Sequence, residues 1–212
     1  MRDERLPLLR RHAALRCAVG RYCPLGFNAT WAYLTATAGP APDLRRDPAA
    51  LLRALDMLEE SRAVHLTEVA EFAARRHLEK AAGRRSPHPS DTAALRGPRW
   101  PSTSPPSRLG LIAAVANRHA AFRQFPYPDE TLSSDTRVRQ LADLHARLDA
   151  SASAYLEALG RPAPAAVAEL TATIDAIDDL TAPGYAPLNG CLLPWLRFAN
   201  LLAYAVAASA AK

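Results

Sequence analysis

The stretch between Pro48 and Gly83 constrains the fold most, because it contains no glycine and no further proline. Asp47 stands just before it as a natural N-cap, and Pro48 takes the first helical position, where its missing N–H costs nothing. Gly83 is the kind of residue that ends a helix. The sequence therefore predicts one long helix over residues 48–82, several turns longer than a typical globular helix.

The apolar residues of this predicted helix fall on one side. At about 100° per residue, most of them share a stripe made of Leu51, Leu55, Leu58, Leu66, Val69 and Ala73. The stripe predicts that the rest of the chain packs around this helix. Arg62 and His65 lie within it, whereas Glu60, Glu68 and Glu71 project to the opposite side.

Other segments show the same helical spacing of apolar residues, and no segment shows the alternation of a half-buried strand. Apolar periodicity and turn residues predict helices over 5–22, 28–38, 108–125, 134–159, 164–180 and 190–211. Asn28, Ser134 or Asp135, and Asn189 are the expected caps. The sequence predicts an all-α protein, a single domain over 1–212, built as a bundle of six to seven helices.

The connection over 83–107 differs in composition from the rest, being rich in proline, serine and arginine with Trp100 alone among them. Connections of this length are uncommon within a compact domain. Two interpretations stay open: a functional cover over a site, or a disordered linker. Residues 91–95 have the composition for one short helical turn within it.

Charge and cysteine content narrow the class of protein. Of the 26 basic residues only Lys80 and Lys212 are lysine, and the formal net charge is +5. This arginine bias is typical of a GC-rich bacterial genome. The three cysteines show no CxxC spacing, which argues against a disulfide framework and a thiolate zinc site. We expect a cytoplasmic protein without a signal peptide.

The apolar run 192–211 raises the question of a membrane span, but Arg197 and Asn200 interrupt it and alanine is abundant. We expect a buried core helix and no membrane partner. Arg197, Asn200 and Tyr204 follow each other at i, i+3 and i+7 along one face of this helix. They could bind a carboxylate or another polar ligand group. The alternative is the solvent edge of an alanine-rich helix.

Four predicted helices each carry one histidine on or beside the core-facing side: His12, His65, His119 and His145. A buried imidazole is costly unless it forms a hydrogen bond. Histidines that meet in a bundle would suit a transition metal, a haem iron or a general base. The alternative is four separate histidines, each donating to a backbone carbonyl or lying at the rim of the core. Inward carboxylates are too few for a di-iron site.

These observations favour a small-molecule enzyme or ligand-binding protein with a pocket lined by histidine and arginine inside the bundle. We expect His65, Arg62, His119 and His145 as catalytic candidates, and a ligand-binding set of His12, Arg197, Asn200, Tyr204 and Trp100. The hypothesis requires Arg62 and His65 to share one cavity with at least two other histidines. A tailoring step in bacterial specialised metabolism would fit such a protein.

A basic, nucleic-acid-associated subunit of a larger complex is the alternative function. Its support is the set of arginine pairs at 10–11, 45–46, 75–76 and 84–85, together with Arg96 and Arg99. Arginine attracts phosphate, and Trp100 is the one candidate stacking platform in the long connection. This alternative requires the pairs to form one continuous basic face.

Overall fold

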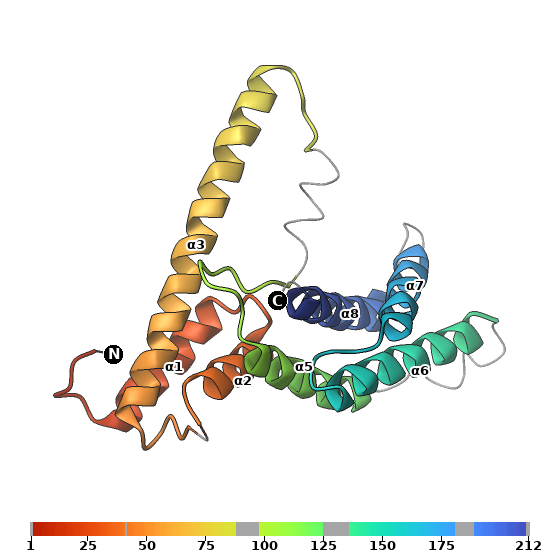
Figure 1. Ribbon diagram of the computed structural model, residues 1–212. Helices are drawn as coiled ribbons and strands as arrows, with labels where there is room; N and C mark the ends of the chain where they lie inside the picture. Colours follow the sequence, from red (N-terminus) through yellow and green to blue (C-terminus); the bar gives the residue numbers. More distant parts are fainter. Residues whose placement is uncertain (1, 41, 88–97, 125–135, 181–188, 211–212) are drawn as a thin grey trace. The chain divides into compact units, whose positions relative to one another are not determined.

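The computed structural model describes residues 2–40, 42–87, 98–124, 136–180 and 189–210 (Figure 1). Within these ranges there are seven helices and no strand, which confirms the all-α class. The helices are α1 (Leu8–Arg21), α2 (Phe27–Thr37), α3 (Pro48–Ala81), α5 (Arg108–Arg123), α6 (Thr136–Glu157), α7 (Pro164–Leu180) and α8 (Asn189–Ala210).

The chain groups into two compact units, Met1–Gly110 and Leu111–Lys212. The first unit contains α1, α2, α3 and the chain that leads into α5. The second contains most of α5 together with α6, α7 and α8. The expectation of one domain over the whole chain stays a prediction.

The start of α3 forms as the sequence predicts. The Asp47 side chain accepts hydrogen bonds from the backbone N–H groups of Ala49 and Ala50, at 2.9 and 3.0 Å. These bonds satisfy two of the donors that a helix leaves unpaired at its N-terminus. Pro48 occupies the first helical position. Local sequence chemistry therefore sets where this helix begins.

The end of α3 is equally well defined. Gly83 adopts φ +86°, a conformation that favours glycine. Its N–H donates to the carbonyl of Lys80, while the Arg84 N–H donates to the carbonyl of Glu79. This pair of bonds is the Schellman motif, which satisfies the last carbonyls of a helix.

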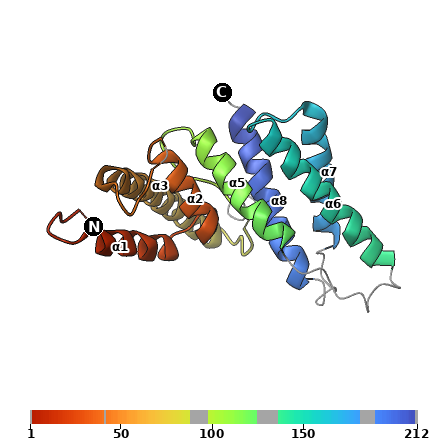
Figure 2. The same ribbon diagram turned by 90° about the horizontal axis from the view of Figure 1, so that it is seen from below.

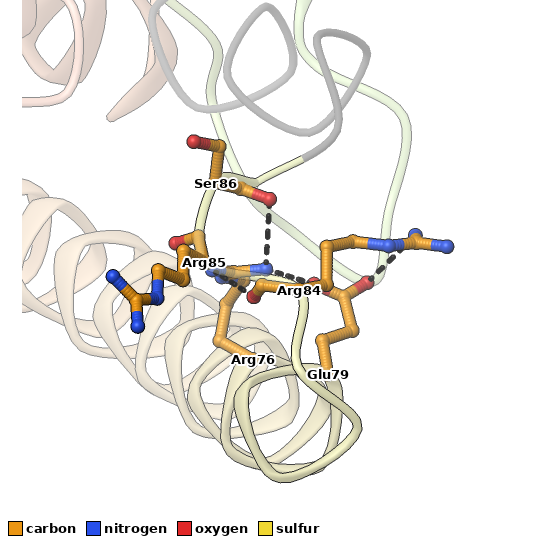
Figure 3. Close-up of polar contacts among 5 residues, drawn as sticks. All are labelled: Arg76, Glu79, Arg84, Arg85 and Ser86. Atoms are coloured by element: carbon orange, nitrogen blue, oxygen red, sulfur yellow. Dashed lines mark hydrogen bonds and ion pairs between the residues drawn. The ribbon is translucent and has the colours of Figure 1, made fainter.

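Arg76 strengthens this helix end from the side, as Figure 3 shows. Although it is an arginine, it is buried, with 7% of the residue exposed. Its guanidinium forms an ion pair with Glu79 and donates to the carbonyls of Arg85 and Ser86, at 3.0 and 3.3 Å. Burial of a charge is tolerated when it is paired and bonded in this way. Arg76 therefore has a structural role in fastening the chain beyond α3.

The first half of α3 builds the core of the first unit with α1 and α2, whereas its second half extends beyond them (Figures 1 and 2). From Ala50 to Ser61 one side of α3 is buried, and it packs on Leu15, Val19, Ala29 and Leu34 of the two shorter helices. The apolar stripe was expected to be buried along its whole length, and this is wrong. Leu66 and Val69 are 52% and 40% exposed, because α1 and α2 are too short to cover a helix of about 51 Å.

The last part of the long connection lies against the first unit. Trp100 is buried, and its ring stacks on that of Tyr33 at a centroid distance of 4.4 Å. The Tyr33 hydroxyl accepts a hydrogen bond from the Ser107 N–H at 2.8 Å. These contacts hold residues 98–107 against the first unit. The interpretation of the connection as a disordered linker is therefore wrong for this part of it. The turn expected over 91–95 lies outside the described residues.

Two acids that the sequence assigns to the outer side of α3 hold this segment. Glu60 accepts hydrogen bonds from both side-chain hydroxyls of Ser102 and Thr103, at 2.8 and 2.6 Å. These bonds lower the pKa of the Glu60 carboxyl, because they favour its ionised form. Glu68 forms an ion pair with Arg99. Glu60 and Glu68 therefore have a structural role, because they bind residues 99–103 of the connection to the surface of α3.

The second unit packs α6, α7 and α8 against one another, with α5 joined to α6 and α8 through side chains. Its core contains Leu141, Leu144, Leu148, Tyr155, Leu170, Ile177, Leu192, Trp195 and Phe198. The stretch Leu192–Ala210 of α8 is long and apolar enough to span a membrane by length and composition alone. Core helices of soluble proteins pass the same test, and 44% of this stretch is buried within the protein.

Helix bounds agree with the predictions within a few residues, but one expected cap is wrong. Asn28 lies inside α2, whose N-cap is Gly26 at φ +86°. Because α2 begins before Asn28, the amide of Asn28 is not the cap. The first described residue of α8 is Asn189, and its role as a cap stays a prediction. The expected caps of α6, Ser134 and Asp135, and Phe125 lie outside the described residues.

Candidate functional site

Two of the four predicted histidines belong to the first unit, His12 within α1 and His65 beside the residue that follows α1. His12 is buried, and its ring lies edge-on to that of Trp31 at 5.3 Å. His65 of α3 is half-buried beside Tyr22, at 5.5 Å between ring centroids. Tyr22 follows His12 by ten residues, or about 15 Å along the helix axis. The structure gives these two histidines separate surroundings within the first unit.

The other two histidines, His119 and His145, come together in the second unit around Asp149. The Nε2 atom of buried His119 lies 2.7 Å from an Asp149 carboxylate oxygen, and Arg123 approaches the same oxygen to 3.4 Å. His145 lies one turn before Asp149 on α6. This acid therefore links α5 to α6 through His119.

Aromatic side chains surround these two imidazoles. His145 stacks on Phe122 at 4.2 Å and meets Trp195 edge-on at 5.2 Å, while His119 stacks on Phe198 at 6.0 Å. Phe122, Trp195 and Phe198 are all buried. The imidazoles therefore serve as flat core side chains as well as polar groups. This arrangement agrees more closely with separate structural histidines than with imidazoles gathered around one ion.

Among the described residues, no three histidine, cysteine or acidic side chains form a group that could hold a metal ion. Zinc and related ions in proteins need at least three such ligands. The Nε2 atom of His119 is already hydrogen-bonded to a carboxylate oxygen of Asp149. A metal ion held by three or more such ligands, one of the possibilities raised by the histidines, thus has no ligand set in this part of the chain.

Burial lowers the pKa of His145, and the nearby His119 lowers it further, while Asp149 opposes them. Protonation of His145 is therefore less favourable in the folded protein than in the unfolded chain. Because this pKa is depressed on folding, its contribution to stability is present above the ordinary histidine pKa of about 6.5 and is lost as pH falls.

We expect the free energy of unfolding to decrease between pH 7.5 and 5, measured by urea denaturation followed by circular dichroism. His145→Phe should make this decrease smaller. His77→Gln, at an exposed position of α3, is the matched control and should keep the wild-type pH dependence. If the free energy of unfolding of His145→Phe depends on pH as it does in the wild type, His145 is not the source of this pH dependence.

The predicted polar stripe of α8 lies at the surface of the second unit. Arg197 is exposed, whereas Asn200 and Tyr204 are half-buried. Arg197 lines a small pocket of about 270 Å³ with Arg118 and with the apolar side chains Ala121, Phe122, Pro194, Trp195 and Phe198. Arg197 therefore lies at the solvent edge of α8, which is the alternative considered above. Asn200 and Tyr204 do not line this pocket.

Arg62 lies on the wall of the largest of the pockets described here. This pocket, of about 610 Å³, lies between α1 and the first half of α3. Its lining comprises Ala14, Cys17, Ala18, Arg21, Tyr22, Leu55, Leu58, Glu59 and Arg62. Arg62 is exposed, although the sequence places it within the apolar stripe of the helix. His65 is not part of the lining.

Tyr22 also lines this pocket, and no sequence pattern singled it out. Its hydroxyl lies 2.9 Å from the Ser61 side-chain oxygen and donates to the Ser61 carbonyl at 3.0 Å. Burial raises the pKa of Tyr22, so the phenol stays neutral. Ala14, Ala18 and Tyr22 recur every four residues and mark one face of α1. That spacing is the signal that could have located the pocket.

The basic residues proposed for nucleic-acid binding do not all face solvent. Arg11 and Arg76, one member of each of two pairs, are buried at 5% and 7% exposure. Arg99 is engaged by Glu68. Arg96 lies outside the described residues. The described pairs therefore offer fewer free charges to phosphate than their number in the sequence suggests.

Comparison with protein-family models finds no match, and searches of curated proteins and of solved structures find no similar protein.

Proposed function

We propose that this protein binds a small amphipathic molecule, with an apolar body and an acidic group, in the pocket between α1 and α3. The observation that carries the proposal is the pocket itself: about 610 Å³ with a mainly apolar lining from two helices. Ligand pockets in proteins commonly measure about 300–1,000 Å³ and combine apolar walls with a few polar groups. The lining of this pocket fits that description.

The arginines of the pocket supply the expected preference for an acid. Arg21 of α1 and Arg62 of α3 both line it, and neither forms a hydrogen bond or ion pair with the described residues. Glu59, the acid in the lining, is bonded to Arg2 at 2.7 Å. The remaining charge is positive, which favours a carboxylate or similar anion at the end of an apolar chain.

This proposal keeps the ligand-binding half of the function expected from the sequence and moves it to a different set of residues. Leu55, Leu58 and Ala18 contribute the apolar walls, and Arg62 remains in the site. A chemical reaction and a place in specialised metabolism stay predictions, since no cluster of reacting groups lies in this lining.

Binding of dodecanoate provides the first test, with Cys17 as a reporter because it is free, exposed and part of the lining. We expect dodecanoate to slow alkylation of Cys17 by N-ethylmaleimide, measured by mass spectrometry of its peptide. Ala18→Trp fills the pocket and should abolish this protection. Ala13→Trp adds the same ring at an exposed position of α1 outside the lining, and should preserve it.

The charge of the ligand provides the second part of the test. Arg62→Gln and Arg21→Gln should each weaken dodecanoate binding about tenfold, the effect of losing one charge-assisted hydrogen bond. Dodecanol, which has the same chain without a charge, should bind wild type and both variants equally. Protection that persists in Ala18→Trp, or no protection in the wild type, would overturn the proposal.

A further inference from the structure

A second pocket lies on the other side of α1, against α2 and the chain that precedes α3. It measures about 400 Å³ and is lined by His12, Arg16, Trp31, Thr35, Pro42, Asp43, Leu44 and Arg45. It shares no lining residue with the α1–α3 pocket. Its lining is also more polar, with a histidine and two arginines from two separate segments.

The two arginines differ in how they are held. The Arg16 guanidinium lies over two aromatic rings, 5.4 Å from the Trp31 centroid and 5.5 Å from that of Phe27. Such cation–π contacts fix its position without using its N–H groups. Arg45 lies on the segment between α2 and α3. Neither guanidinium forms a hydrogen bond or ion pair with the described residues.

Asp43 is the acid in this lining, and its carboxylate is already engaged. One oxygen accepts a hydrogen bond from the Arg45 backbone N–H at 2.9 Å, and the other lies 3.5 Å from Nε of Arg46. Arg46 is not part of the lining. With one acid against two arginines in the lining, Asp43 offsets only part of the positive charge of Arg16 and Arg45.

The pKa of His12 is lowered by its burial and by the positive charge around it. The residue is 7% exposed, and burial is the largest cause of its lowered pKa. Arg45 and Arg16 lower the pKa further, and Asp43 raises it. A neutral imidazole and two cations therefore face one space with no anion between them other than Asp43.

We propose that this pocket binds the phosphate group of a small molecule. A tetrahedral dianion offers several oxygens, which suits donors that converge from α1 and from the 42–45 segment, whereas a carboxylate offers only two. Its charge would favour protonation of His12, so that the imidazole becomes a third cationic donor. Binding should therefore take up a proton at His12. This proposal is independent of ligand binding in the α1–α3 pocket.

Sulfate is the first probe, because it keeps the same charge between pH 5 and 8 and isolates the titration of His12. We expect sulfate to bind more tightly as pH falls, measured by isothermal titration calorimetry, and to shift the His12 ring signals in NMR spectra. Arg16→Gln and Arg45→Gln should each weaken binding about tenfold. Arg10→Gln, an exposed position of α1 outside the lining, is the matched control and should bind as wild type.

The variant His12→Gln tests proton uptake separately from binding of the anion. It should bind sulfate with an affinity that no longer changes with pH, while keeping the helix content of the wild type. Glycerol phosphate should compete with sulfate, and glycerol should not. The proposal is overturned if Arg16→Gln and Arg45→Gln bind as the Arg10→Gln control does. It is also overturned if a single-stranded oligonucleotide displaces sulfate and glycerol phosphate does not, which would make nucleic acid the partner.

Discussion

Replacing Trp195 by alanine is expected to lower the free energy of unfolding of the second unit by about 3–5 kcal/mol, the usual cost of removing a large aromatic side chain from a core. Trp195 is 2% exposed, and its ring contacts Phe122 at 5.8 Å and His145 at 5.2 Å. These contacts join α8 to α5 and to α6. Loss of the indole would therefore leave a cavity where three helices meet.

Urea denaturation followed by circular dichroism measures this effect without depending on tryptophan fluorescence. Leu193→Ala is the matched control on the same helix, because Leu193 is 45% exposed and its truncation should change stability by less than about 1 kcal/mol. Trp195→Phe should recover much of the lost stability. If Trp195→Ala costs no more than Leu193→Ala, the indole does not occupy the core described here.

The second large effect is expected at Gly110, near the start of α5. A Cβ atom at this position would lie 2.6 Å from two carbons of the Tyr33 ring and 2.8 Å from the methyl carbon of Thr37. Tyr33 cannot move aside easily, because it stacks on Trp100 and its hydroxyl binds the Ser107 N–H. Gly110→Ala should therefore destabilise the first unit by about 1–3 kcal/mol, the usual cost of overpacking.

Gly20→Ala is the control for the Gly110 prediction, and its expected effect has the opposite sign. Gly20 also lies in a helix, but a Cβ atom there would meet only Phe27, at an ordinary contact distance of 4.0 Å. This change should stabilise the protein by about 0.5–1 kcal/mol, because alanine favours a helix more than glycine does. Equal effects of the two substitutions in urea denaturation would contradict the close approach of Gly110 to Tyr33.

Tertiary structure decided the candidate sites, and the physical reason differs between them. The histidines were grouped by the helix face they share in a periodic pattern. Such a pattern fixes a direction around each helix axis and says little about which helices are neighbours or where along them they touch. His119 of α5 and His145 of α6 are neighbours because the hydrogen bond between His119 and Asp149 joins these two helices. His12, by contrast, lies in α1 beside Trp31, and His65 lies beside Tyr22. Arg62 is exposed and lines the α1–α3 pocket, although the pattern places it within the apolar stripe.

Sequence alone determined the features that depend on local chemistry. The start of α3 at Asp47 and Pro48, its end at Gly83 and the all-α class follow from capping, backbone freedom and apolar periodicity, all of which act within a few residues. The two pockets along α1 depend instead on distant segments: α3 for one, α2 and the 42–45 segment for the other. Their volumes and linings are set by the packing of those segments, which no local pattern records.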